Sequence, residues 1–328
     1  MSVNRNRAIW YFFTTLLTIF NICTIRIFDR GWPLYVVTAN AIVSLCGLVY
    51  HMHVDKIAAK RPFMRFVRAM LFLNSISVAV MLLLSLFILN SQYHNRLTAD
   101  GKVNSEEEVK EFVEGTDKDV VILETENLYI FCPKYESISF VSGERPKKSD
   151  KSIALCVAAA FQAKYNYRFT EDEIVGWHAS DGRLERGKPE KNLGALTYVD
   201  GVPRIWDVNE AEEAVKKAAE EGGTGYQQFV VLYEGKRGTH DSDEFRCFRV
   251  LALLNDRLCI IDSAKQMHYR EYIDALEKLG VRNALYCDMG SGWNYSWYRN
   301  EEETAVDIIG SPWPFSHNWL VFRGRFPD

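Results

Sequence analysis

The segment from residue 288 to residue 299 holds the side chains of this sequence that are best suited to chemistry. Asp288 directly follows the apolar run at residues 284–287, and Gly290 and Gly292 then permit a tight loop. Rings and an amide follow at Trp293, Asn294 and Trp297. A sugar site needs such groups, because rings cover C–H faces while amides and carboxylates bind hydroxyls. The pattern therefore indicates a carbohydrate site, or else a glycine turn whose rings cover the core.

Two more polar residues stand at the starts of strand-like runs. His317 and Asn318 precede the run at residues 319–322, and Arg249 opens the run at residues 249–254. An arginine in a strand can point inward only if its donors are met, as a bound phosphate or carboxylate would do. Pointing to solvent is the commoner case for arginine, and a lone histidine is more often structural than catalytic.

Composition and motifs exclude several classes of function. The net charge is −4, which gives no basic footprint, so we expect no nucleic-acid partner. No P-loop, G-x-S-x-G, H-E-x-x-H or dinucleotide motif is present, so we expect no cofactor. None of the seven cysteines forms a C-x-x-C pair, so we expect no metal site. Cys132, Cys156, Cys259 and Cys287 lie in apolar runs and read as small buried hydrophobes; a disulfide stays open, but no pairing follows from the sequence.

Apolar patterning predicts more strands than helices after residue 119. Asp200-Gly201 predicts a hairpin turn. One helix is expected over residues 208–221, with Asp207 and Glu210 as a capping box, and another over residues 270–279, ended by Gly280. Strands are expected over residues 120–124, 128–132, 138–141, 193–199, 202–206, 229–233, 249–254, 257–261, 283–287, 306–309 and 319–322. Residues 153–161 are a buried strand or helix. This mixture predicts an α+β domain with a mixed sheet and helices.

Three charge-free apolar segments precede that domain, at residues 8–25, 32–50 and 69–89. Each is long enough to cross a hydrocarbon core. A cleaved signal peptide is the alternative for the first segment alone, and three spans are preferred because two further spans follow immediately. The basic loop at residues 56–68 then predicts which loops face the cytoplasm. The expected fold is therefore three N-terminal transmembrane helices followed by the α+β soluble domain. We expect the lipid bilayer as a partner and a multi-pass membrane localisation, in the inner membrane of a Gram-negative source, with the C-terminal domain outside the cytoplasm. The expected organisation is an anchor at residues 1–90, a linker at 91–118 with a short helix near residues 106–112, and a domain at 119–328.

Several motifs of this domain resemble those of a known family. The strongest is the run at residues 284–292, a strand followed by a loop that is similar to Asp-Gly-Gly-Gly-Ser. Others lie at residues 157–161, 180–182, 192–195, 223–228, 248–249 and 318–322. Over about residues 120–324 the chain resembles the phosphodiester glycosidase family, the group of uncovering-enzyme-like proteins. Within that family it is most similar to a Bacteroidetes branch.

The resemblance implies a hydrolase that cleaves a sugar-1-phosphodiester, with a glycan or sugar phosphodiester as its partner. Asp288 would be the carboxylate beside the anomeric centre, as in glycoside hydrolysis generally. Arg249 would hold the phosphate and His317 would move a proton. The residues that would bind the sugar are Ser291, Trp293, Asn294, Trp297, Asn192, Gln228 and Asn318.

The sequence departs from the family pattern at three places. The usual Asn-Gly-Gly-Phe element is replaced by Ala158-Ala159-Ala160-Phe161, and Met289 replaces a loop glycine. Val250 and Leu251 follow Arg249, where the family usually has small residues. The first departure favours an alternative function, a non-catalytic carbohydrate-binding or envelope-interaction module. A membrane sensor ranks last, because the basic loop is too short to be an output domain.

Overall fold

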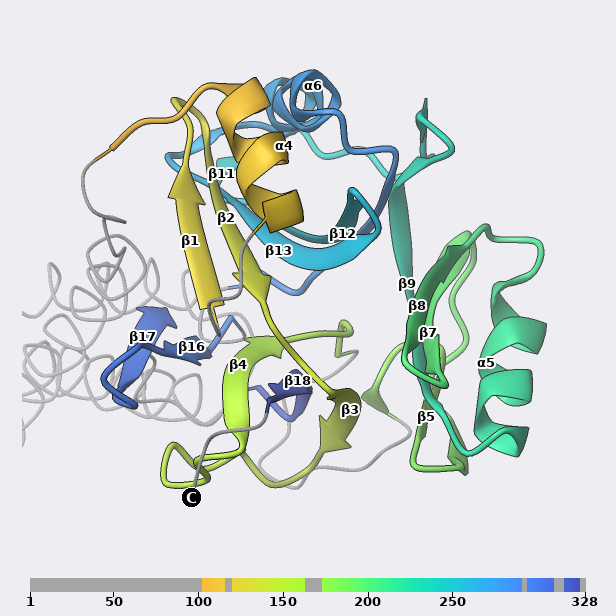
Figure 1. Cartoon of the computed structure of the whole chain (residues 1–328). Helices are drawn as coiled ribbons and strands as arrows, with labels where there is room; N and C mark the ends of the chain where they lie inside the picture. The colour runs from red at the N-terminus through yellow and green to blue at the C-terminus, as the bar shows by residue number, and fades with distance from the viewer. Residues whose placement is uncertain (1–101, 116–119, 163–172, 291–293, 310–315, 325–328) are drawn as a thin grey trace, which may run out of the picture. The chain divides into compact units, whose positions relative to one another are not determined.

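The computed structural model describes residues 102–115, 120–162, 173–290, 294–309 and 316–324. All of them belong to one of the two compact units of the chain, Ser91–Lys164 with Arg168–Asp328. They form eighteen strands and three helices (Figure 1).

This result corrects the predicted fold class. The described residues are mostly β-sheet, and their three helices are short, α4 (Glu106–Gly115), α5 (Ala211–Glu220) and α6 (Tyr269–Leu279). A bilayer span needs about 20 apolar residues, and no helix among the described residues has that length and character. The expected spans at residues 8–25, 32–50 and 69–89 lie outside the described residues. The multi-pass localisation and the bilayer partner are therefore not retained.

The larger sheet has eleven strands, and its main path runs β1-β2-β13-β12-β15-β9-β5-β6. Neighbours on this path pair antiparallel. These eight strands are β1 (Val120–Glu124), β2 (Leu128–Pro133), β13 (Arg257–Ser263), β12 (Arg249–Leu254), β15 (Asn283–Tyr286), β9 (Thr224–Tyr233), β5 (Trp177–Ser180) and β6 (Arg183–Arg186). Three more strands complete this sheet: β7 (Leu193–Val199) and β10 (Lys236–Arg237) pair with β9, and β8 (Val202–Trp206) pairs with β7.

The smaller sheet has five strands in the order β17-β16-β4-β18-β3. These are β17 (Ala305–Ile309), β16 (Ser296–Arg299), β4 (Ile153–Ala158), β18 (Asn318–Arg323) and β3 (Ser137–Ser142). A separate ribbon joins β11 (Phe245–Arg246) to β14 (Met267–His268). Every residue of β4 is buried, so the apolar run at residues 153–161 begins as a central strand.

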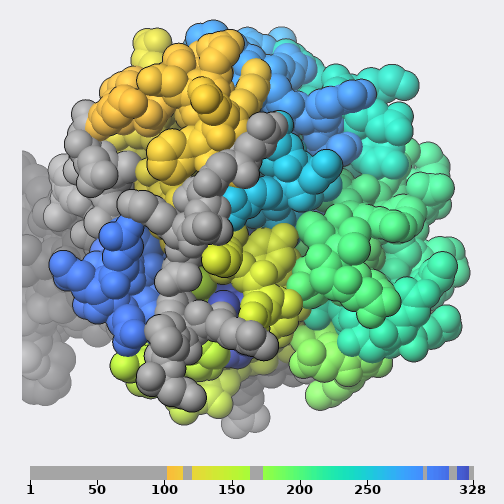
Figure 2. Space-filling model, in the orientation of Figure 1, coloured from red at the N-terminus to blue at the C-terminus, as the bar shows by residue number. Residues whose placement is uncertain are grey.

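Alternation along the strands sorts the core into two main layers. On β12, Val250 and Ala252 face a cluster that includes residues of α4 and α6. Leu251, between them, faces a second cluster with Leu155 and Leu320 of the smaller sheet. Helices α4 and α6 lie over β2, β13 and β12 in Figure 1. In the space-filling view α4 (orange) forms part of the surface (Figure 2). The central strands are therefore buried on both faces, which explains their continuous apolar sequences.

Local sequence signals set most element boundaries. The hairpin of β7 and β8 forms as predicted, with Asp200 and Gly201 both at positive φ (50° and 79°). Helix α6 also forms as predicted, and Gly280 ends it in the left-handed conformation. The predicted start of α5 is wrong: residues 207–210 form a turn, and no side chain caps the helix at Glu210.

Candidate functional site

Asp288 lies just beyond the end of β15, where the larger sheet meets the smaller one. Its backbone N–H donates to the oxygen of Ala159, 3.1 Å away, which follows β4. Cys287 is held to β12 in the same way, through a 3.0 Å bond to the oxygen of Arg249. One carboxylate oxygen of Asp288 accepts the Gly290 N–H at 2.9 Å. The side chain is therefore fixed at a strand end with 9% of the residue exposed.

Burial raises the pKa of Asp288 to about 7, although the Gly290 N–H and the charge of Arg246 act to lower it. A buried carboxylate loses its water shell, and one backbone donor with one nearby cation does not replace that shell. An acid with a pKa near neutrality can give or take a proton at physiological pH, which is a property of catalytic groups.

Aromatic and basic side chains gather around Tyr286, the last residue of β15. The His240 ring stacks on Phe229 with centroids 4.6 Å apart. It also lies 5.4 Å from Tyr269 and 5.4 Å from Tyr286. The Arg246 guanidinium is 6.0 Å from the Tyr286 ring centroid. We call His240, Arg246, Tyr269, Tyr286 and Asp288 the Asp288 cluster.

Several polar atoms of the Asp288 cluster are buried without a hydrogen bond. Among the described residues, the hydroxyls of Tyr269 and Tyr286 and Nε2 of His240 find no partner. Burial and the charge of Arg246 lower the pKa of His240, so its ring is neutral at pH 7. Buried polar groups are normally satisfied, so three unpaired atoms in one cluster are unusual.

Two predicted sugar-binding residues hydrogen-bond to the backbone of Ala159 and Ala160, the segment that also accepts the Asp288 N–H. Asn318 donates to the oxygen of Ala160 at 3.0 Å and accepts the Ala160 N–H at 2.7 Å. Gln228 donates from Nε2 to the oxygen of Ala159 at 3.5 Å. The structure thus brings Asp288, Gln228 and Asn318 together around the alanine segment.

Arg249 lies in a buried ion pair instead of facing the Asp288 carboxylate. Its Nε and Nη2 donate to the two carboxylate oxygens of Asp262 at 2.6 and 2.7 Å. Both residues are buried. The Nε–Nη2 edge of the guanidinium is therefore occupied by a protein carboxylate, and Nη1 is buried without a hydrogen-bond partner among the described residues.

The remaining predicted site residues are spread over other parts of the structure. Trp297 is fully buried and packs with Trp319 in a separate cluster. The buried Asn294 accepts from the Ser296 hydroxyl through its backbone oxygen. His317 is half-buried, and its N–H donates to Gln162. Asn192 is exposed, at positive φ, just before β7. Ser291 and Trp293 lie outside the described residues.

The sequence did not single out His240, Arg246 or Tyr286. His240 and Arg246 lie between β10 and β12, in a polar segment that has no motif. Tyr286 is one residue of an apolar strand. The only local signal was the pairing of a histidine and an arginine just upstream of Phe248-Arg249.

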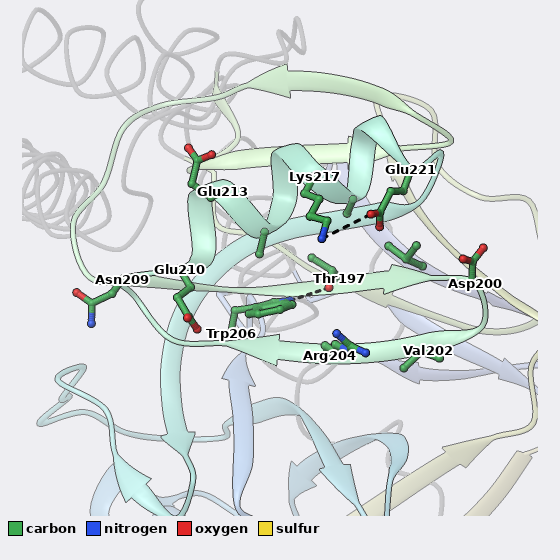
Figure 3. A pocket seen from close by; sticks show the side chains of 13 residues that line it. Thr197, Asp200, Val202, Arg204, Trp206, Asn209, Glu210, Glu213, Lys217 and Glu221 are labelled. Atoms are coloured by element: carbon green, nitrogen blue, oxygen red, sulfur yellow. Dashed lines mark hydrogen bonds and ion pairs between the residues drawn. The ribbon is translucent and has the colours of Figure 1, made fainter.

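A distinct groove of about 620 Å³ lies between helix α5 and the β7–β8 hairpin (Figure 3). At its floor, Trp206 donates to the Thr197 hydroxyl at 2.7 Å, and Lys217 lies 3.7 Å from Glu221 on its rim. Its lining contains no residue of the Asp288 cluster. Within the described part of the chain, no group of three or more His, Cys, Asp or Glu residues could hold a metal ion.

Comparisons with known proteins give a likeness at the level of the fold. No family model matches the sequence, and no curated protein matches it. One similar solved structure is the zebrafish N-acetylglucosamine-1-phosphodiester alpha-N-acetylglucosaminidase catalytic domain, auto-inhibited by pro-peptide. It is 11% identical, with a TM-score of 0.46 over 63% of this chain and 82% of that chain. A likeness at this level concerns the fold alone; it assigns no activity and does not reach the Bacteroidetes branch.

Proposed function

We propose that this domain is a hydrolase of sugar-1-phosphodiesters, with Asp288 as the carboxylate beside the anomeric carbon. The observation that carries the proposal is the buried Asp288 carboxyl group, whose pKa burial raises to about 7. The sequence resemblance at residues 284–292 supports the same assignment. Glycosyl hydrolysis passes through a transition state with positive charge on the sugar, and a nearby carboxylate stabilises that charge or attacks the anomeric carbon.

The surrounding groups fit an anionic leaving group. A phosphate leaves readily, so the reaction depends less on proton donation and more on charge placement. Arg246 supplies a positive charge that acts on Asp288, since it lowers the pKa of that carboxyl group. The unpaired hydroxyls of Tyr269 and Tyr286 and the neutral His240 ring can bind sugar or phosphate oxygens.

Within this proposal Arg246 and Arg249 have different tasks. Arg246 is partly exposed and pairs with Glu244, itself largely exposed, at 3.0 Å. It can therefore turn toward a phosphate at small cost. The Nε–Nη2 edge of Arg249 is bound by both carboxylate oxygens of Asp262, so Arg249 fixes β12 against β13. We propose Arg246 as the phosphate-binding residue and Arg249 as a positioning residue.

The test uses the full chain and a panel of sugar-1-phosphodiesters that differ in the sugar. We expect release of free sugar, with kcat/KM rising as the pH increases through about 7, because Asp288 acts in its ionised form. Asp288→Asn should abolish release. The matched control is Asp256→Asn, at an exposed turn with positive φ that asparagine accepts. Full activity of the Asp288→Asn variant would contradict the catalytic role proposed for this carboxylate.

The alanine segment favours a second candidate, a non-catalytic carbohydrate-binding module. Ala158, Ala159 and Ala160 are buried and bring no polar side chain to the site. Saturable glycan binding, with no product from any phosphodiester of the panel, would select this candidate.

A further inference from the structure

Two buried cysteines face each other across neighbouring strands of the larger sheet. Strands β2 and β13 pair antiparallel, with Ile260 opposite Phe131, so the next rung places Cys259 opposite Cys132. The two sulfur atoms are 2.8 Å apart. Residues opposite each other in an antiparallel pair have Cα atoms about 4.5–5.5 Å apart, which is within the range that a disulfide requires.

Among the described residues, the other cysteines pack in other parts of the core. Cys132 and Cys259 are both fully buried in the cluster beneath α4 and α6. Cys156 and Cys287 belong to two other clusters, and Cys247 packs against the cluster of Cys287. We propose that Cys132 and Cys259 are a modification site, at which an oxidising disulfide converts the two thiols to a cross-link between β2 and β13.

The reaction is a thiol–disulfide exchange with a small-molecule disulfide such as oxidised glutathione. One cysteine loses its proton to water, and its thiolate attacks a glutathione sulfur, breaking the glutathione disulfide and forming a mixed disulfide. The second thiolate attacks the protein sulfur of that mixed disulfide. The products are the Cys132–Cys259 bond and two reduced glutathione molecules, so the two electrons that the protein loses are gained by glutathione.

Because the pair is buried in the folded protein, the exchange takes place during folding. The hydrogen bond to Cys132 and burial raise the pKa of Cys259 far above its usual value. The reactive thiolate is therefore scarce once the strands have closed. Exchange proceeds while the strands are open, and a bond formed then is protected from reductants afterwards.

The cross-link would join residues 127 positions apart. Closing a loop of this length restricts the unfolded chain strongly, so the oxidised protein should unfold at a midpoint on the order of 10 °C higher than the reduced protein. The cross-link would stabilise the pairing of β2 with β13, which joins the β1–β2 hairpin to the rest of the larger sheet.

The test refolds the full chain with oxidised and reduced glutathione, blocks free thiols by alkylation, and maps the tryptic peptides. Trypsin releases Cys132 on residues 119–134 and Cys259 on residues 258–265. We expect these two peptides as one cross-linked species that a reductant separates. Recovery of both as separate alkylated peptides, or of either linked to a different cysteine, would overturn the proposal.

Substitutions provide a second measurement. Cys132→Ala should abolish the difference in unfolding midpoint between oxidised and reduced protein. Cys156→Ala, a matched change at another fully buried cysteine, should leave that difference intact. The opposite pattern contradicts the proposal, and if Cys132→Ala does not fold, the peptide map of the unsubstituted chain decides alone.

Discussion

Asp288 is costly to the fold in its ionised form, because burial raises its pKa to about 7, against about 3.9 in an unfolded chain. Between these values the folded state keeps a proton that the unfolded state has lost. The contribution of this residue to the free energy of unfolding is therefore full below about pH 4, where the carboxyl group is protonated in both states. It is lost as the pH rises from about 4 through 7. A carboxyl group retained at such a cost is more readily explained by chemistry than by packing.

We predict that Asp288→Asn flattens this part of the pH dependence. The asparagine oxygen can still accept the Gly290 N–H, but it never ionises. As the pH rises from 4 to 8, the unsubstituted protein should lose ~4 kcal/mol of unfolding free energy, and the variant should not show this loss. Urea unfolding at each pH measures this. Equal pH dependence in both proteins would show that the carboxyl group is better solvated than its burial implies.

The two arginines near the site should respond oppositely to substitution. Arg249→Met leaves Asp262 buried and uncompensated, which should cost about 3–5 kcal/mol of stability. Arg246→Gln removes a partly exposed charge and should cost at most about 1 kcal/mol, while it raises KM for a phosphodiester. Urea unfolding and substrate titration separate the two effects. A large stability loss from Arg246→Gln with unchanged KM would contradict the proposed division of tasks.

Among the elements, α4 shows how a segment expected to be a linker becomes part of the core. Val109 and Val113 are fully buried beside α6, whereas Phe112, at the edge of this buried stripe, is 47% exposed. The helix follows the spacing of its apolar residues, so one face is buried and the other meets solvent.

Val109→Ala should therefore cost ~2 kcal/mol of unfolding free energy, from lost burial and the cavity left behind. Phe112→Ala is the comparison and should cost less than Val109→Ala, because Phe112 is 47% exposed and its removal leaves no enclosed cavity. Thermal or urea unfolding measures both. Equal losses would mean that α4 does not dock through this face.

The elements that the sequence predicted best are those whose signals are local. The Asp200-Gly201 turn, the glycine stop of α6 and the bounds of β12 all depend on residues within a few positions. The start of α5 was wrong because Asp207 and Glu210 make a turn that resembles a capping box in sequence. The membrane helices were read from hydropathy alone, and no helix of the described residues supports them.

The site was less predictable, because its parts meet through pairing of distant strands. Asp288 could be singled out by its place after an apolar run. Its contact with Ala159 and the approach of His240 and Arg246 follow from the sheet order. The Arg249–Asp262 pair depends on the register between β12 and β13, which residue patterns do not give.

At the scale of the whole molecule, the contacts of α4 bear on where the folded domain begins. Glu106 pairs with Lys278 of α6 at 2.7 Å. The backbone oxygens of Lys110 and Val113 accept from Asn255 and Arg257 at 3.1 and 2.8 Å. These contacts join α4 to α6 and to the β12–β13 turn. We therefore propose that the domain predicted over residues 119–328 begins near residue 102.

Two fragments test this boundary. Residues 102–328 keep α4 and should unfold cooperatively, while residues 119–328 expose the apolar surface that Val109 and Val113 cover. The shorter fragment should lose several kcal/mol, since each fully buried aliphatic side chain contributes about 1.5–3 kcal/mol and the helix adds its own contacts. It should also bind a hydrophobic dye, because a layer of the core is open to solvent. Urea unfolding of both fragments gives the difference directly. Equal midpoints would place the boundary at residue 119 and make α4 an accessory, in which case the valine substitutions should also be silent.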